Sequence, residues 1–360
     1  MGLSCGLVGL PTCGKTTIYN AITAAGAASY DGSEMNRAIV NIPDRRLEPL
    51  AVIYRSAEVV PATLEVVDIP GLKAGSTAAE GRGTRLLGHI KNVDALLHVV
   101  RCFKDENIPF EYSTIDPARD VETIDLELMV ADSQTLRHKI DRLSTGVRAH
   151  DAAAIHEVAN CQKVNAGLEE GVPARKQGLN KLELASIREC NLVSLKPVLY
   201  IANIELAEDL DKGYVKALQA IADAEGSEMI AVCGRDEAEI WELEPEERSE
   251  FLAELGFAES SMERLLHAAY RVLGLVTFFS GNEREVHAWT CRKGDGAATA
   301  AGKIHSDMER GFIRMEVMRY DDLIELGSES AVAHAGKLSI EGRGYQVQDG
   351  DVVKVLFKVK

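Results

Sequence analysis

The chain has 360 residues, of which 46% are hydrophobic and 27% are charged, and its formal net charge is −16 at pH 7. This composition is ordinary for a globular protein of two or three domains, and no apolar run reaches the ~20 residues that a membrane-spanning helix needs. The acidic balance disfavours non-specific binding of nucleic acid by the whole chain, so neither a membrane nor DNA is an expected partner.

The strongest pattern in the N-terminal part is Gly-Leu-Pro-Thr-Cys-Gly-Lys-Thr-Thr at residues 9–17, a complete G-x-x-x-x-G-K-[ST] phosphate loop. It stands between a short apolar run at 3–8, which reads as a buried strand, and a helical pattern at 17–22. Small and polar residues at 24–33 read as a mobile loop, and a further strand is expected at 38–43. This strand–loop–helix order predicts nucleotide binding.

Each part of the phosphate loop has a physical role. Gly9 and Gly14 allow the backbone to curl until successive N–H groups point at one phosphate. Lys15 carries a positive charge to the outer phosphates, the Thr16 hydroxyl is suited to Mg²⁺, and the helix that follows adds its positive N-terminal end. The nucleotide-binding candidates in this motif are Gly9, Thr12, Cys13, Gly14, Lys15, Thr16 and Thr17.

A second motif follows the strand expected at 62–68, where the chain reads Asp68-Ile69-Pro70-Gly71. Downstream of a phosphate loop, Asp-x-x-Gly predicts a carboxylate that holds Mg²⁺ through water and an amide, at Gly71, that bonds the γ-phosphate. The glycine-rich stretch at 74–83 is typical of a flexible switch, with an ordinary surface loop as the alternative. The two motifs together favour a GTPase-like switch.

Strands at 95–101, 196–203 and 228–233 complete an alternating pattern that predicts a doubly wound α/β domain. Between about 118 and 195 the strand pattern is absent, and an apolar stripe at spacings of 7, 4, 3 and 4 predicts an antiparallel helical insertion. Packing between the insertion's own helices is favoured over a partner surface. The stripe comprises Met129, Leu136, Ile140, Leu143 and Val147, and Gly167 and Gly171 are expected to break the second helix.

From Val276 onward short strands predict a separate α+β module, with a turn at 348–351 before the last strand. Residues 276–360 carry twelve Lys or Arg and thirteen Asp or Glu, so this part escapes the acidic excess and is where RNA contact is best sought. A solvated surface charge is the alternative for each of its basic side chains. The candidates are Lys303, Arg310, Arg314, Lys354 and Lys358.

The seven cysteines are scattered and form no C-x-x-C pair, which favours reduced thiols in a cytoplasm and argues against a zinc site. Cys13 lies inside the phosphate loop, where a redox brake is weighed against a merely small residue, which is the favoured interpretation. His98, inside an apolar strand, is expected to be structural. No serine or cysteine nucleophile constellation is found, so no catalytic residue is assigned.

These stretches together resemble the YchF subfamily of Obg-related P-loop NTPases, the Obg-like ATPases. The resemblance implies an Obg-type G domain at 1–275 with a coiled-coil insertion at about 118–195, and a C-terminal TGS-like domain of β-grasp shape at 276–360. It also implies an ATPase that associates with the ribosome or ribosomal RNA. The matching stretches are 9–17, 67–72, 98–103, 200–203, 300–307, 311–314 and 349–351.

The residues at the expected base site favour ATP over GTP. Guanine-specific enzymes carry N-K-x-D, whose carboxylate accepts two hydrogen bonds from the base, whereas here Leu206 stands at that position, three residues after Asn203. The family's usual Glu is also absent, and Glu205, one position early, is expected to point elsewhere. The resemblance implies that Asn203 and the backbone at Ile204 contact the base.

Three departures from the family pattern weaken the hydrolytic machinery. Phe110 stands where the family tends to carry a histidine, and Ser33 is the one candidate for the Mg²⁺-binding threonine of the first switch. Leu72 follows the Asp-x-x-Gly motif and has no group that orients water. We therefore expect slow or partner-activated hydrolysis of ATP with Mg²⁺, with a nucleotide-gated binding module or a GTPase as alternatives.

Overall fold

The structure is a computed structural model that describes residues 3–31, 36–72, 88–105, 108, 112, 114–205, 209–210, 212–234, 237, 240, 243, 247 and 260–358. Contacts between Cα atoms divide the chain into two compact units. Unit 1 comprises Met1–Ala38 and Glu65–Ala269, and unit 2 comprises Ile39–Leu64 and Tyr270–Lys360. Within the described residues no helix is both long and apolar enough to cross a membrane.

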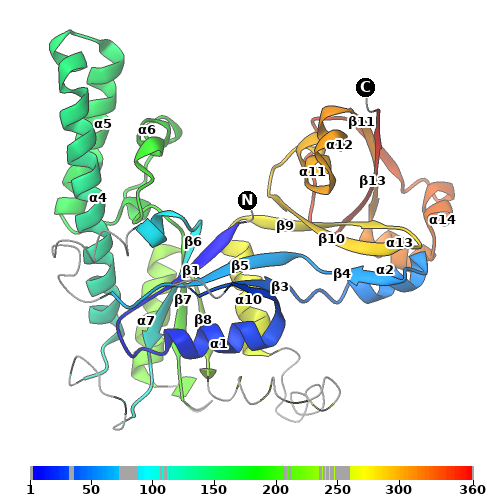
Figure 1. Ribbon diagram of the computed structural model, residues 1–360, viewed down its shortest axis with the longest axis horizontal. Helices are drawn as coiled ribbons and strands as arrows, with labels where there is room; N and C mark the ends of the chain where they lie inside the picture. The colour runs from blue at the N-terminus through cyan, green and yellow to red at the C-terminus, as the bar shows by residue number, and fades with distance from the viewer. Residues whose placement is uncertain are drawn as a thin grey trace. The chain divides into compact units, whose positions relative to one another are not determined.

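A seven-stranded sheet forms the centre of unit 1, in the order β2-β3-β5-β1-β6-β7-β8 (Figure 1). The pairs β5–β1, β1–β6, β6–β7 and β7–β8 are all parallel, as the alternation of strands and helices predicts. The strands are β1 (Ser4–Val8), β2 (Ala27–Asp31), β3 (Arg37–Asn41), β5 (Thr63–Asp68), β6 (Ala95–Arg101), β7 (Val198–Asn203) and β8 (Glu228–Val232).

Helices cover this sheet because its central strands are apolar on both faces. Every residue of β1, β6 and β7 is buried, which is the pattern of strands packed between two helical layers. Among the described residues of unit 1 outside the insertion, the named helices are α1 (Lys15–Gly26), α7 (Gly213–Glu225) and α10 (Ser261–Val272), and the last turn of α10 belongs to unit 2. One expectation is wrong here: residues 24–33 do not form a loop throughout, because α1 continues to Gly26 and β2 pairs onto the sheet edge.

The helical insertion begins with α4 (Pro117–Arg148), a helix of 32 residues whose N-terminus is capped by the Asp116 side chain. It packs along α5 (Ala152–Glu169), and the two form a long antiparallel pair (Figure 1). The insertion continues through η1 (Ala174–Lys176), α6 (Lys181–Ile187) and η2 (Arg188–Cys190).

Three of the five residues of the predicted apolar stripe pack within this insertion: Met129, Leu136 and the partly buried Ile140. Met129 and Leu136 of α4 are buried in one cluster with Val164 and Leu168 of α5. The expected helix break at Gly167 is wrong: this glycine lies inside α5, where a Cβ would lie 2.6 Å from the Gln177 side chain. This glycine therefore lets the Gln177 side chain pack closely against α5 and does not mark a turn.

Unit 2 is built on a six-stranded sheet in the order β12-β11-β13-β9-β10-β4. Its core lies between this sheet and α11, with Phe278, Phe312 and Met315 among the buried residues. The elements are α2 (Leu47–Tyr54), β4 (Glu58–Val60), β9 (Leu275–Gly281), β10 (Glu285–Arg292), α11 (Ala297–Ile304), α12 (Ser306–Arg310), β11 (Phe312–Arg319), α13 (Tyr320–Leu326), α14 (Glu329–His334), β12 (Ser339–Glu341) and β13 (Asp351–Phe357).

The two units divide the chain differently from the expected boundary between 275 and 276. The C-terminal unit begins at Tyr270, and it also includes residues 39–64, which run from within β3 to within β5 of the seven-stranded sheet. Within unit 2, β4 pairs in parallel with β10, with Glu58 opposite Glu285. Sequence patterns missed α2 and β4 because short elements of this kind depend on partners far away along the chain.

Candidate functional site

The phosphate loop follows β1 and feeds directly into α1, as predicted. Its backbone takes positive φ values at three positions: 152° at Gly9, 59° at Thr12 and 96° at Gly14. A Cβ at Gly9 would lie 2.4 Å from the Val99 carbonyl oxygen, and a Cβ at Gly14 would lie 2.0 Å from the amide nitrogen of Asn203. Both glycines are thus required by backbone conformation and by close approach to neighbouring strands.

Lys15 is buried and is held by the loop itself. Its Nζ donates to the carbonyl oxygens of Gly9 at 3.0 Å and Leu10 at 2.7 Å. A lysine ammonium in this position, beside the N-terminus of α1, supplies the point charge that a polyphosphate needs.

Thr16 and Asp68 come together on the same side of the loop. The Thr16 hydroxyl donates to Asp68 Oδ2 at 3.3 Å, although the two residues come from α1 and the end of β5. Burial raises the pKa of Asp68, while the hydrogen bond from Thr16 and the charge of Lys15 oppose that rise. A hydroxyl beside a carboxylate fits Mg²⁺, which binds one or two protein oxygens and completes its octahedron with phosphate and water.

The Asp-x-x-Gly segment lies against the phosphate loop. The backbone N–H of Leu72 donates to the Gly9 carbonyl at 3.2 Å. A Cβ at Gly71 would lie 3.1 Å from both Lys15 Nζ and the Pro11 nitrogen, so this glycine allows the two motifs to touch. The segment expected to move, at 74–83, lies outside the described residues.

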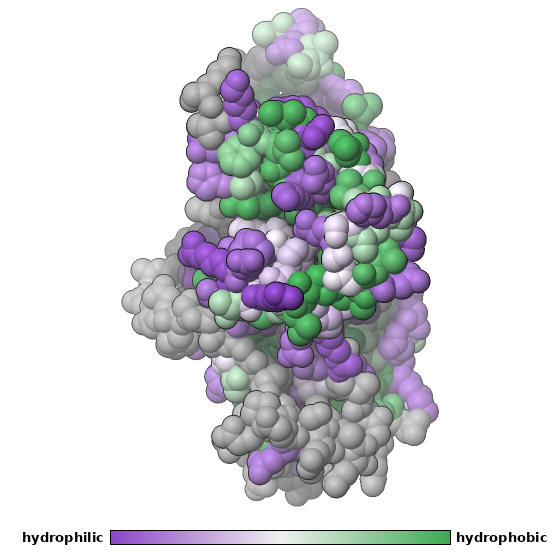
Figure 2. All heavy atoms as spheres, turned by 90° about the vertical axis from the view of Figure 1, so that its right-hand side faces the viewer, coloured by the Kyte–Doolittle hydropathy of each residue, from purple (hydrophilic) through white to green (hydrophobic). Residues whose placement is uncertain are grey.

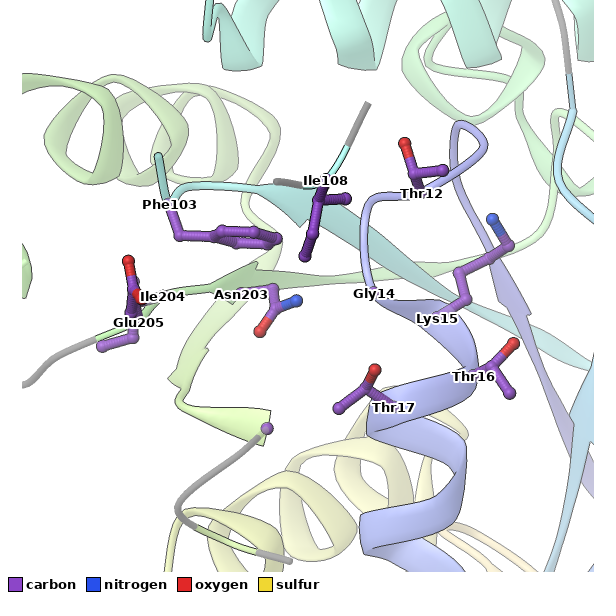
Figure 3. A pocket seen from close by; sticks show the side chains of 11 residues that line it. Thr12, Gly14, Lys15, Thr16, Thr17, Phe103, Ile108, Asn203, Ile204 and Glu205 are labelled. Atoms are coloured by element: carbon purple, nitrogen blue, oxygen red, sulfur yellow. The ribbon is translucent and has the colours of Figure 1, made fainter. Parts of the chain in front are cut away.

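A cavity of about 560 Å³ opens between the start of α1 and the ends of β6 and β7 (Figure 3). Thr12, Gly14, Lys15, Thr16, Thr17, Asn203 and Ile204, all predicted site residues, line it together with Phe103, Ile108, Glu205 and Gly234. Four other predicted residues are absent from this lining: Gly9 and Cys13, which belong to the phosphate loop itself, and Asp68 and Gly71. The cavity lies at the carboxyl ends of parallel strands, where α/β folds place their ligands.

Asn203 connects β7 to the phosphate loop. Its amide nitrogen donates to the Cys13 carbonyl at 3.0 Å, and Figure 3 shows the amide pointing toward the loop. The backbone N–H of Ile204 already donates to the Val232 carbonyl at 2.9 Å, so at this residue only the carbonyl is left for a base. Glu205, which was expected to point elsewhere, is also among the residues that line the cavity.

Arg101 is a residue that sequence reasoning missed. It is buried at the end of β6, and its Nε and Nη2 donate to the carbonyls of Phe103 at 3.3 Å and Asp105 at 3.1 Å. Its Nη1 donates to the Ile108 carbonyl at 3.4 Å, and its guanidinium carbon lies 4.4 Å from the centroid of the Phe103 ring. Arg101 thereby fixes two residues of the cavity wall; a charged residue ending a buried parallel strand is the signal that points to it.

Two remaining predictions concern residues close to the site. The Cys13 thiol is buried, and burial raises its pKa, which supports the interpretation as a small residue over a redox brake. His98 is buried against Tyr200 with ring centroids 5.6 Å apart, and burial lowers its pKa to about 3, in agreement with a structural role. Within the described residues, no group of three or more metal-ligating side chains occurs.

Several predicted residues cannot be placed. Ser33, Phe110 and Leu206 lie outside the described residues. The basic RNA candidates are in unit 2 and all are exposed, with Arg310 paired to Asp307 and Lys354 at 4.0 Å from Glu329. Figure 2 shows hydrophilic side chains interleaved with hydrophobic ones over the face that it presents.

Comparison with known proteins matches both ends of the chain to family models. Residues 4–140 match a model described as a 50S ribosome-binding GTPase, and residues 275–358 match YchF-GTPase_C, described as a protein of unknown function. The Ribosome-binding ATPase YchF of Bacillus subtilis is 42% identical over 366 residues, and that of Haemophilus ducreyi is 43% identical over 363 residues. Each alignment covers 100% of both chains.

A solved structure, described as the Schizosaccharomyces pombe YchF GTPase, superposes with a TM-score of 0.88 at 31% identity. It covers 99% of this chain and 98% of its own chain, which confirms the predicted fold class. The phosphate loop, the Asp-x-x-Gly segment against it and the cavity at the strand ends agree with this match. The chain therefore belongs to the YchF family of P-loop NTPases.

Proposed function

We propose that this chain binds ATP with Mg²⁺, hydrolyses it slowly, and works in the cytoplasm as a switch that associates with the ribosome. The observation that carries this proposal is the convergence of Lys15, Thr16 and Gly71 beside one cavity at the carboxyl ends of β6 and β7. The name Ribosome-binding ATPase, which the curated relatives bear, supports both the nucleotide and the partner.

The phosphate end of the cavity follows from the loop geometry. Backbone N–H groups of residues 9–17 would cradle the phosphates, and Lys15 would turn from the Gly9 and Leu10 carbonyls to the outer phosphates. Thr16, and Asp68 through water, would hold Mg²⁺, which when bound neutralises charge on the phosphates. The Gly71 amide would bond the γ-phosphate and so make the following segment sensitive to hydrolysis.

The residues at the phosphate end of the cavity specify a triphosphate more closely than the residues at the base end specify adenine. Phe103, Ile108 and Ile204 supply apolar walls, and Leu206 removes the carboxylate with which N-K-x-D binds guanine. Glu205 lines the same cavity and is an acceptor for an exocyclic amino group, which both purines in question possess. A GTPase is therefore the competing assignment, and the descriptions of the matching family model and the solved structure favour it.

Slow hydrolysis is inferred from what the cavity lacks. No histidine or glutamine is among the described residues that line it, and the Leu72 side chain is buried in the apolar core of unit 1. A residue in that position cannot orient the attacking water, so rapid turnover would need a group from a partner. If turnover is negligible even with the partner, the chain is a nucleotide-gated binding module.

The decisive measurement is phosphate release by the purified chain with ATP or GTP, with Mg²⁺ or EDTA, and with or without ribosomes. We expect slow Mg²⁺-dependent release from ATP that ribosomes accelerate, and a weaker response to GTP. Lys15→Ala is the negative control, since it removes the charge on the outer phosphates. Preferential turnover of GTP would replace the ATPase assignment, and turnover of neither nucleotide would reject an enzyme.

The ribosome contact is tested separately in the C-terminal unit, which we propose to be the TGS-like domain that senses the partner. Arg314→Gln with Lys358→Gln removes two exposed cations, whereas Arg284→Gln and Lys293→Gln remove two others that were not candidates. We expect weaker co-sedimentation with ribosomes only for the first pair, because each cation that neutralises a phosphate of the RNA adds to the binding affinity. Equal binding by both double variants would reject these side chains as the contact.

A further inference from the structure

A second cavity, of about 340 Å³, lies where the helical insertion meets residues 88–91 of unit 1. It shares no lining residue with the nucleotide cavity. Its wall is mostly basic and contains one thiol. The lining residues are Lys91, Thr135, His138, Lys139, Arg142, Glu189 and Cys190.

The thiol in this wall has a second thiol directly behind it. The thiols of Cys190 in η2 and Cys161 in α5 shift each other's pKa, and both residues belong to the apolar cluster that holds the insertion together. Cys161 has no exposed surface, whereas Cys190 is 6% exposed and faces the cavity. A small solute that enters the cavity therefore meets Cys190 first.

The charges around the pair favour a thiolate on Cys190. The interaction with Cys161 is the largest cause that lowers the pKa of Cys190. Lys139 and Arg142 also lower it, burial and Glu157 raise it, and the result is a pKa of about 7. The same interaction raises the pKa of Cys161.

The neighbouring charged groups are themselves partly paired. The Lys139 ammonium donates to the Ser186 carbonyl at 2.8 Å and pairs with Glu157, while Arg142 lies 3.9 Å from Glu189. Lys91 and His138 complete the basic wall, and the Lys91 ammonium donates to the Thr135 hydroxyl at 3.4 Å. Cations therefore outnumber carboxylates around the cavity, which stabilises an anion inside it.

Four other cysteines lack this environment. Burial raises the pKa of Cys5, Cys13, Cys102 and Cys291, so each is held as a neutral thiol at pH 7. Because the thiolate is the reactive species, modification should discriminate strongly between these buried thiols and Cys190.

We propose that Cys190 and Cys161 form a thiol site for small hydroperoxides, in which Cys190 attacks the peroxide and Cys161 resolves the product. In the first step the Cys190 thiolate attacks the distal oxygen, the O–O bond breaks, and Cys190 becomes a sulfenic acid as hydroxide or alkoxide leaves. In the second, the Cys161 sulfur attacks the Cys190 sulfur, the proton of its thiol joins the departing hydroxyl, and water leaves from a disulfide. The peroxide is the oxidant throughout, and the disulfide ties α5 to η2.

The test uses the full-length reduced protein, exposed to limiting hydrogen peroxide and analysed by alkylation and peptide mass spectrometry. We expect Cys161 and Cys190 to lose their free thiols together, ahead of Cys5, Cys13, Cys102 and Cys291, and to appear as one cross-linked peptide. In Cys161→Ser, Cys190 should accumulate as a sulfenic acid that dimedone traps. In Cys190→Ser, Cys161 should stay reduced, since no route leads the peroxide to it.

Electrostatic activation is tested by a matched pair of variants on α4. Arg142→Gln removes a cation from the cavity wall, whereas Arg137→Gln removes one that pairs with Glu169 and does not line the cavity. We expect alkylation of Cys190 by iodoacetamide at pH 7 to slow by about twofold or more in the first and to be unchanged in the second. The pH midpoint of that alkylation should lie near 7 in the parent chain.

The proposal is overturned if Cys190 reacts no faster than Cys5 or Cys291, or if peroxide leaves Cys161 reduced while Cys190 advances to a stable sulfinic acid. If Arg142→Gln and Arg137→Gln change the alkylation rate of Cys190 equally, the cations of the cavity wall do not activate this thiol. None of these readouts depends on nucleotide turnover, so the thiol site and the proposed function stand or fall separately.

Discussion

At the scale of single residues, the side chains of Asn203 and Arg101 shape the site by holding backbone segments in place. Asn203 holds the phosphate loop through one carbonyl, and Arg101 holds the opposite wall through three. Both are buried at the ends of neighbouring parallel strands. The geometry of the cavity is thus set by the rigid sheet, which is how a binding site is pre-organised.

Arg101→Lys should weaken ATP binding without unfolding the protein. A lysine keeps the charge but lacks the planar fork that reaches the carbonyls of Phe103, Asp105 and Ile108 together. We expect the Kd for ATP to rise about tenfold, equivalent to ~1.4 kcal/mol. Isothermal titration measures it, with Arg37→Lys as control, since the Arg37 side chain is 39% exposed and pairs with Glu65 at the surface. Equal affinities in the two variants would show that the Arg101 fork does not shape the site.

His98 should make stability depend on pH in a predictable direction. The imidazole is neutral in the fold down to about pH 3, whereas the unfolded chain takes up a proton near the ordinary value of 6.5. Protonation below pH 6.5 therefore favours the unfolded state, and the free energy of unfolding falls as the pH drops. Between pH 7.5 and 5.0 this group should cost about 2 kcal/mol.

The contribution of His98 is isolated by comparison with His98→Phe, which cannot titrate. Urea unfolding at both pH values should show the parent losing about 2 kcal/mol more than the variant as the pH falls. The comparison cancels the opposing carboxyl groups, such as Asp68, whose pKa burial raises. Parallel pH dependences for the two proteins would mean that His98 is not buried as a neutral base.

At the scale of elements, sequence patterns predicted those strands and helices whose formation depends on residues close together in the chain. The phosphate-loop sheet could be predicted because β1, β6 and β7 are continuous apolar runs, and the insertion because its stripe has helical spacing. The edge strand β2 could not, since its residues are small and polar and become a strand by pairing. Arg101 was missed for a related reason: its partners are backbone carbonyls, which leave no mark in composition.

The helical insertion is tied to the nucleotide domain by a buried ion cluster. Arg175 of η1 forms two hydrogen bonds with Asp125 of α4, at 2.9 and 2.7 Å, and one with Glu225 of α7 at 3.3 Å. The Tyr200 hydroxyl of β7 also donates to Glu225, at 3.0 Å. The side chains of Arg175, Asp125 and Glu225 are each exposed by 10% or less, so their charges depend on one another.

Arg175→Met should therefore destabilise the fold far more than loss of a surface charge. Removing the guanidinium leaves the buried Asp125 with Lys176, 3.9 Å away, as its remaining cation, which costs about 3 kcal/mol. Arg137→Met, which breaks an exposed pair with Glu169 in the same insertion, should stay within about 0.5 kcal/mol. Urea unfolding followed by circular dichroism measures both. A difference below about 1 kcal/mol between them would contradict the account.

At the scale of the whole molecule, the C-terminal unit is completed by an early segment of the chain. Residues 39–64 supply α2, whose Leu47 and Leu50 are buried, and β4, which pairs with β10. Arg46 Nη1 lies 2.7 Å from Asp349 Oδ2, and a Cβ at Gly281 would lie 2.3 Å from the Tyr54 ring. The unit is thus discontinuous in sequence, which is why a search for one boundary near residue 275 could not delimit it.

Residues 270–360 made alone should be much less stable than the same residues joined to 39–64 through a flexible glycine-serine linker. Without the segment, the edge of β10 loses its partner strand and the apolar surface beneath Leu47 and Leu50 meets water, at roughly 2 kcal/mol for each leucine. Urea unfolding and sedimentation should show a lower midpoint and self-association for 270–360, with both restored in the joined chain. The informative control carries Leu47→Ser and Leu50→Ser in the joined chain, which keeps the strand but removes the apolar contacts. If 270–360 alone unfolds at the same urea concentration as the joined chain, residues 39–64 merely lie on a unit that folds without them.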